Sequence, residues 1–229
     1  VDEIDYRFKI TDEEVLLDVE VDGVMQQFNV EKDYDDDLGV LFEEFKIRKC
    51  ANDCIFCFVD QNPKGMRSGM YFRDGDYRLS YLHGHYITLT NMGQNELDRI
   101  VEQKLSPLYI SVHTTDVELR KKLLLYGKND YLLEKLNFLS SNNIELHAQV
   151  VLMPGLNDGK FLNKTIKDLY SFHPQLRSLS IVPVGLTKHR ENLPNLQLVD
   201  STPSLEQEIQ VDLELIQLCS FLLQEGLLA

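Results

Sequence analysis

The stretch YITLTNMGQNELDRIVEQKLSPLYISVH, residues 86–113, contains a complete strand–helix–strand pattern. Apolar runs suited to buried strands stand at its two ends, and residues 95–105 between them have a helical pattern. Further strand-like runs lie on either side of this stretch, at residues 45–50, 145–154 and 179–185. Repeated units of this kind form right-handed crossovers on a parallel sheet, either curled toward a barrel or doubly wound. The sequence therefore predicts an α/β fold with five strands after residue 45.

The acidic residues are concentrated at the N-terminus. Residues 1–44 hold 16 Asp and Glu against 3 Lys and Arg, whereas the whole chain of 229 residues has 37 and 23. Nearly all of the formal net charge of −14 thus belongs to this segment, and the total says little about binding partners. Three short runs, residues 6–10, 14–23 and 25–32, predict a small β-rich module that ends near residue 44.

Composition excludes several classes of protein. No run approaches the roughly 18–20 apolar residues of a membrane span, and no signal peptide begins the chain, so we expect a cytoplasmic protein. In that reducing compartment neighbouring cysteines are ligands or catalysts more often than disulfides. No P-loop, nucleophile elbow or zinc-protease helix motif occurs, which leaves nucleotide-triphosphatase and hydrolase activities without support.

Two basic groups follow strands at the rim where functional residues gather in such folds. One group is Lys64, Arg67, Arg73 and Arg78, and the other is Lys188, His189 and Arg190. Each could bind a carboxylate, a phosphate or a nucleic-acid backbone, or could be a solvated loop.

The most informative motif is KCANDCIFCFVDQ, residues 49–61, with cysteines at 50, 54 and 57. This spacing after a strand lets three thiolates converge on one inorganic centre, whereas structural zinc normally takes four protein ligands in two pairs. The fourth cysteine, Cys219, lies in an apolar helical stretch, where packing is the expected role. A three-cysteine [4Fe–4S] cluster leaves one iron open for a substrate or cofactor.

The pattern C-x3-C-x-aromatic-C, with Phe56 before the last cysteine, resembles the signature of the radical S-adenosylmethionine (SAM) superfamily. More narrowly, residues 54–67, 77–91, 105–124, 145–158 and 182–194 resemble an uncharacterised bacterial family. Its members have a PDZ-like module, a radical SAM barrel and a C-terminal domain of unknown function. The superfamily's core is a partial (β/α)6 barrel.

The resemblance implies three regions in this chain. Residues 1–44 are the C-terminal part of a PDZ-like module, which we expect to be a small β-rich remnant. Residues 45–200 form the partial barrel, with about five strands visible. Residues 201–229 are a helix at the start of a truncated C-terminal domain.

The resemblance also implies a mechanism. Cys50, Cys54 and Cys57 are expected to hold a [4Fe–4S] cluster whose open iron binds SAM. One electron, from a reductant such as a flavodoxin or ferredoxin, cleaves SAM to methionine and a 5′-deoxyadenosyl radical. The substrate of that radical is not specified by the sequence, and binding of nucleic acid is neither excluded nor supported.

SAM-binding residues are expected near the ends of successive strands. Alternation along residues 108–113 puts Ser111 and His113 on one face, although His113 could equally be a hydrogen-bonded histidine without a catalytic role. The apolar residues among the candidates for SAM binding could equally be core residues. The full set of expected cofactor-binding residues is Phe56, Thr90, Asn91, Ser111, His113, Met153, Pro154 and Val184.

Two other classes of function stay open. The chain could be an iron–sulfur electron-transfer or redox-sensing protein that does not cleave SAM. It could also be an interaction protein in which the PDZ-like module binds partners. The open iron site favours the radical enzyme, because an electron carrier gains nothing from a vacant coordination position.

Overall fold

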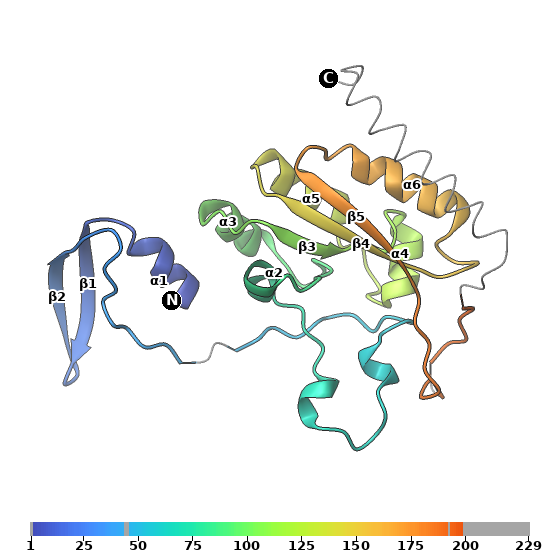
Figure 1. Cartoon of the computed structure of the whole chain (residues 1–229), viewed down its shortest axis with the longest axis horizontal. Coiled ribbons are helices and arrows are strands. Elements are labelled where there is room, and N and C mark those ends of the chain that lie inside the picture. The colour runs from blue at the N-terminus through green and yellow to red at the C-terminus, as the bar shows by residue number, and fades with distance from the viewer. Residues whose placement is uncertain (1, 44–45, 192, 199–229) are drawn as a thin grey trace. The chain divides into compact units, whose positions relative to one another are not determined.

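The computed structural model describes residues 2–43, 46–191 and 193–198, and the chain divides into two compact units (Figure 1). The first unit is Val1–Ile47 and the second is Arg48–Ala229. The three regions expected from the sequence stay predictions. The predicted helix at residues 201–229, with Cys219, lies outside the described residues.

The first unit contains a helix, α1 (Glu3–Lys9), and a hairpin of β1 (Glu14–Val21) and β2 (Val24–Glu31). The strands are antiparallel and joined by Asp22 and Gly23, which both have positive φ, at 53° and 79°. An Asp-Gly pair suits such a two-residue turn, because its twist matches that of the strands. The hairpin agrees with the expected β-rich segment, but its PDZ-like nature remains a proposal.

The prediction that residues 6–10 form a β run was wrong, because residues 6–9 belong to α1. Asp2 and Asp5 form a reciprocal capping box, in which each side chain accepts a hydrogen bond from the other's backbone N–H. This cap satisfies N–H groups that a helix start leaves unpaired. Five residues were too few to separate the helical period from the strand period.

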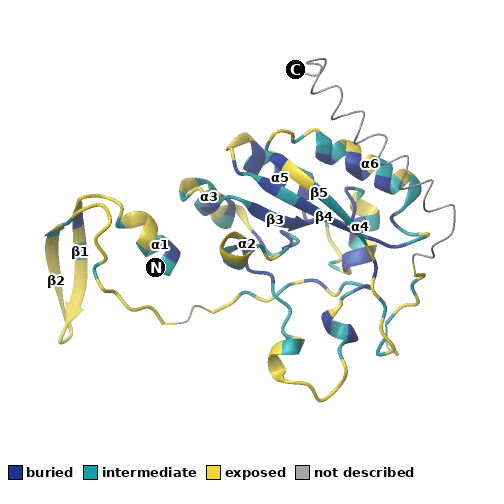
Figure 2. Cartoon of the chain, viewed as in Figure 1, coloured by how far each residue is buried: buried dark blue, intermediate teal, exposed yellow. Residues whose placement is uncertain are grey.

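The second unit contains a parallel three-stranded sheet in the order β3–β4–β5. The strands are β3 (Leu108–Ser111), β4 (Leu146–Leu152) and β5 (Leu176–Pro183). Strand β4 lies in the centre, with every second residue buried and the residues between them half-buried (Figure 2). The predicted α/β class with parallel strands is therefore confirmed in its coarse form.

Five α-helices accompany the sheet in the described part of the second unit. Helix α6 (Gly159–Tyr170) packs Leu162 and Ile166 against Val150 and Leu152 of β4. The other four are α2 (Tyr77–His83), α3 (Gln94–Glu102), α4 (Val117–Leu124) and α5 (Leu132–Ser141). Among the described residues, no helix has the length and apolar content that crossing a membrane requires.

Two of the five expected strands do not form. Of the first run, the described residues 46–50 contribute only an antiparallel bridge between Lys49 and Asp74, and residues 86–91 contribute only a parallel bridge between Ile87 and Ile110. After Ile87 the backbone leaves strand geometry, since Leu89 has a φ of 60°.

Side chains, rather than a neighbouring strand, satisfy the carbonyl groups of this irregular segment. Thr88 O accepts from Arg120 at 2.8 Å, Leu89 O from Lys135 at 2.7 Å, and Thr90 O from Tyr126 at 2.8 Å. Sequence periodicity cannot reveal that side chains replace a strand here, because the three donors come from positions 32 to 46 residues away.

Candidate functional site

A cavity of about 810 Å³ lies in the second unit, where the carboxyl ends of all three strands meet the cysteine loop. Ser111, Val151 and Pro183 represent β3, β4 and β5 on its wall. In parallel α/β sheets this edge is where ligands bind. Its other lining residues are Cys50, Asn52, Cys54, Phe56, Cys57, Phe58, Val59, Asn62, Gly69, Met70, Phe72, Arg73, Asp74, Gly84, His85, Tyr86, Thr88, His113, Gln149, Val184 and Gly185.

The cysteine loop is fixed by backbone hydrogen bonds. Cys50 N–H donates to Arg73 O at 2.9 Å, and Cys57 N–H donates to Cys54 O at 3.0 Å. Ile55 N–H donates to Leu123 O at 3.0 Å, which ties the loop to the end of α4. All three cysteines are free thiols, and all three line the cavity.

Two of the thiols, Cys54 and Cys57, are poor acids in this setting. Burial, together with the neighbouring Cys50 and Cys57, raises the pKa of Cys54 to about 12, while Arg120 acts in the opposite direction. Burial also raises the pKa of Cys57. A metal centre bound here must therefore displace protons, so its assembly favours alkaline pH.

The polar part of the wall comes from the end of β3. His113 has a φ of 62° and is 4% exposed, and its Nδ1 accepts the Val151 N–H at 3.2 Å. Burial lowers the pKa of His113 to about 3, with a further contribution from Arg120, so the ring is neutral and carries its proton on Nε2. The ring meets Phe56 edge-on, with the two centroids 4.6 Å apart.

Asn52 is a wall residue that the sequence analysis missed. It is 3% exposed, and its Nδ2 donates to Thr88 Oγ1 at 2.7 Å. Its Oδ1 is buried without a hydrogen-bond partner among the described residues. A buried acceptor without a partner is costly, so this atom is a candidate contact for a ligand donor. Its position between two cysteines was the only signal in the sequence.

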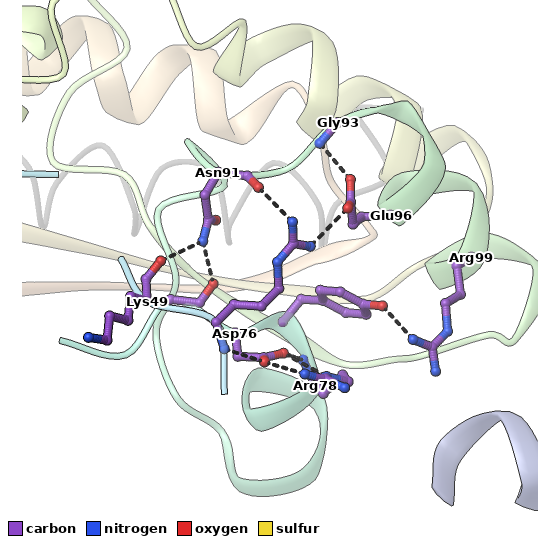
Figure 3. Close-up of polar contacts among 10 residues, drawn as sticks. Lys49, Asp76, Arg78, Asn91, Gly93, Glu96 and Arg99 are labelled. Atoms are coloured by element: carbon purple, nitrogen blue, oxygen red, sulfur yellow. Dashed lines mark hydrogen bonds and ion pairs between the residues drawn. The ribbon is translucent and has the colours of Figure 1, made fainter. Parts of the chain in front are cut away.

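Thr90 and Asn91 do not reach the cavity wall. Thr90 is buried, and its Oγ1 lies 2.9 Å from that of Thr88, so it orients Thr88 from behind. Asn91 Nδ2 donates to Lys49 O at 3.1 Å and to Gly75 O at 3.0 Å (Figure 3). The Asn91 amide thus fixes the residue that precedes Cys50.

Gly75 lies in direct contact with the first cysteine. A Cβ at this position would stand 2.7 Å from Cys50 Cα, 2.9 Å from Cys50 N and 3.1 Å from Asn91 Nδ2. Real Cβ atoms do not approach backbone atoms so closely, and only glycine fits. The next turn is fixed by Asp76, which caps α2 and pairs with Arg78 at 2.7 Å.

The apolar candidates lie in one cluster around Phe56. Buried Phe56, Met153 and Val184 pack with Leu123 and Leu124 of α4. Val184 and Phe56 reach the cavity, whereas Met153 is fully buried behind it. Pro154 follows Met153 and is half-buried away from the cavity wall. Whether any of them contacts a cofactor remains a prediction.

Three arginines of the basic groups expected at the rim are committed to other contacts. Arg73 pairs with Asp60 at 2.6 Å and with Asp53 at 2.9 Å, and Arg78 pairs with Asp76. Arg190 donates to Ile55 O at 3.0 Å. Anion binding by these arginines would require these contacts to break.

A second pair that the sequence analysis missed lies on the cavity wall. His85 Nδ1 and Asp74 Oδ2 are 2.7 Å apart, and Asp74 Oδ1 accepts the Asp76 N–H at 2.9 Å. A carboxylate bonded to Nδ1 holds an imidazole in one orientation and leaves Nε2 for other contacts. Their separation of 11 positions in the sequence gave no signal.

Comparison with known proteins places the chain in a family. No curated protein gave a significant match. A family model described as the radical SAM-like domain matches residues 32–179, which is well over half of the chain and includes all three loop cysteines. With an α/β unit, a parallel sheet and a cysteine-lined cavity at its carboxyl edge, the chain belongs to the radical SAM-like domain family.

Proposed function

We propose that the chain is a radical SAM enzyme that holds a [4Fe–4S] cluster on Cys50, Cys54 and Cys57 and cleaves SAM reductively. The observation that carries this proposal is that the three thiols line one cavity at the carboxyl edge of the sheet. Family membership supports the superfamily but not a specific reaction.

The chemistry of the donor set supports a cluster. Thiolates are soft ligands that suit zinc and iron–sulfur centres. In the described ranges, no three His, Cys, Asp or Glu side chains are placed to ligate a single metal ion. Cys50 and Cys57 nevertheless both lie close enough to Cys54 to raise its pKa. Such spacing suits a polynuclear group, in which each thiolate binds a different iron atom.

Cys50, Cys54 and Cys57 would hold the cluster, which would supply the one electron needed for reductive cleavage of SAM. The chain's own task is to hold the cofactor and exclude water. We assign the apolar packing to Phe56, Met153, Pro154 and Val184. Ser111, His113 Nε2–H and Asn52 Oδ1 offer donors and acceptors to the polar groups of SAM, with Thr90 and Asn91 orienting their neighbours.

The alternative is an iron–sulfur protein that transfers electrons or senses redox state without cleaving SAM. Cavity size favours the enzyme, because about 810 Å³ next to the cysteines lies in the range of small-molecule and cofactor sites. The proposal also includes a cytoplasmic setting, a reductant such as flavodoxin or ferredoxin, and a substrate still to be identified.

Anaerobic reconstitution with iron and sulfide tests the proposal. The chain should take up about one cluster and, after reduction with SAM present, should release 5′-deoxyadenosine that chromatography detects. Tightly bound zinc without iron uptake would contradict the cluster. Cluster uptake without any 5′-deoxyadenosine would favour the electron carrier.

Matched cysteine variants identify the ligands. Alanine at position 50, 54 or 57 leaves two anchoring thiolates, so cluster assembly and 5′-deoxyadenosine formation should both be lost. Cys219→Ala serves as the control and should keep the iron content of the parent. Loss of iron in the control variant would indicate four ligands and no open iron.

A further inference from the structure

The chain segment after β5, residues 185–191, contacts the cysteine loop, and we call this segment the strap. Thr187 N–H donates to Gln61 Oε1 at 3.1 Å, and Thr187 Oγ1 donates to Gln61 O at 2.8 Å. Arg190 Nη2 donates to Ile55 O at 3.0 Å and to Pro194 O at 2.6 Å. Two strap residues thus bind a loop that lies more than 120 positions earlier in the sequence.

Gln61 connects the strap to the cysteines. It is 2% exposed, and its Nε2 lies 3.3 Å from both Phe56 O and Cys57 O, while its Oε1 accepts from Thr187. The nitrogen and the oxygen of the side-chain amide are therefore both hydrogen-bonded inside the protein. A buried amide with both ends bonded has one orientation only.

These contacts fix the peptide units between the second and third cysteines. The carbonyls of Ile55, Phe56 and Cys57 are three in succession, and each accepts a hydrogen bond from Arg190 or Gln61. Because a peptide unit is planar, holding its carbonyl also holds the following N–H and Cα. The direction of the Cys57 side chain is set by these planes.

We infer that the strap is part of the metal-binding site, and that Gln61, Thr187 and Arg190 are positioning residues for Cys57. The strap lies outside the region matched by the family, residues 32–179, so family membership assigns it no role. The identity of the metal centre in this inference rests on the proposed function. The effect of the strap on the conformation of the loop does not depend on it.

Three variants test the inference. Gln61→Glu keeps the size of the side chain but replaces the Nε2 donor by a carboxylate oxygen that repels Phe56 O and Cys57 O. Arg190→Met removes the donor to Ile55 O and keeps the aliphatic length. Thr187→Val is the mildest change, because it removes one hydroxyl and keeps the shape. Lys188→Met is the matched control, since exposed Lys188 neighbours Thr187 on the strap.

Hydrogen–deuterium exchange in the metal-free protein measures the loop directly. The peptide that contains Cys54 to Gln61 should exchange about tenfold faster in Gln61→Glu and Arg190→Met, and less so in Thr187→Val. Peptides from β4 should match the parent, which separates local loosening from unfolding. Parent-like exchange of the loop peptide in all three variants would overturn the inference, whether or not the parent binds a cluster.

Cluster retention in the reconstituted full chain measures the consequence for the metal centre. Loss of iron to a chelator should be about tenfold faster in Gln61→Glu and Arg190→Met than in the parent, with a changed electron paramagnetic resonance signal. Lys188→Met should match the parent in both. A parent that takes up no iron would refute the proposed function. The exchange experiment would still test whether the strap fixes the conformation of the cysteine loop.

Discussion

Gly75→Ala should damage both stability and cluster binding, because the added methyl group overlaps the backbone of Cys50. The Cβ would lie 2.7 Å from Cys50 Cα and 2.9 Å from Cys50 N, and neither backbone atom can rotate away. Overpacking of this kind costs about 1–3 kcal/mol. If the shift also breaks the Asn91 bonds to Lys49 O and Gly75 O, the loss grows by about 1 kcal/mol for each bond.

We therefore expect Gly75→Ala to lower the free energy of unfolding by about 2–4 kcal/mol. Urea unfolding followed by circular dichroism measures this loss, which corresponds to a midpoint lower by about 1–2 M for a slope of roughly 2 kcal/mol/M. Iron uptake during reconstitution should fall as well, because Cys50 is displaced.

Gly69→Ala is the matched control. Gly69 lines the same cavity, a Cβ added to it would meet no atom within 4 Å, and its backbone is not left-handed. Alanine should be neutral there or stabilise the fold by up to about 1 kcal/mol, since it reduces the freedom of the unfolded chain. If the two variants unfold at the same urea concentration, the steric argument for Gly75 is refuted.

Three further predictions concern separate parts of the second unit. Burial opposes ionisation of Asp76, but hydrogen bonds from Arg78 and the Arg48 N–H outweigh it and lower the pKa of Asp76. Its stabilising effect should be complete above about pH 4 and vanish as the pH falls further, so urea midpoints of the parent and Asp76→Asn should converge in acid. Arg120→Met leaves Asp130 as an unpaired buried charge and should cost about 3–5 kcal/mol in urea unfolding; a loss below about 1 kcal/mol would contradict the pairing. Ser111→Ala should keep the cluster and weaken SAM binding about two- to tenfold, as titration calorimetry on the reconstituted protein can measure; unchanged affinity would remove Ser111 from the site.

Sequence periodicity predicted the elements that bury apolar side chains on a regular strand. Strands β3 and β4 follow from such runs, since their continuous or alternating burial matches the residue pattern. Strand β5 was also predicted from its apolar run, but most of its residues are only partly buried or exposed. The strand predicted at residues 86–91 does not form, because the donors to the carbonyls of residues 88–90 are side chains of distant residues. A two-residue alternation indicates which face of a strand is apolar, but it does not indicate which groups hydrogen-bond to the backbone.

The candidate site was partly predictable for the same reason. The spacing of Cys50, Cys54 and Cys57 is local, and the alternation that put Ser111 and His113 together is local too. Asn52 and the pair of His85 with Asp74 were missed, because their positions on the wall depend on how the loop folds over the sheet. The side-chain amide of Asn91 donates hydrogen bonds to backbone carbonyls near Cys50. The spacing of residues in the sequence does not reveal these bonds.

The carbonyl contacts of residues 88–90 also bear on how molecules of this protein can associate. A sheet edge attracts a strand from another chain when its backbone donors and acceptors are unpaired. Beside β3, the carbonyls of Thr88, Leu89 and Thr90 already accept hydrogen bonds from Arg120, Lys135 and Tyr126. In the described part of the chain, β5 forms the other edge and pairs only with β4. Edge-to-edge aggregation of partly folded molecules should therefore proceed through β5, and charged substitutions on its outer side should suppress it.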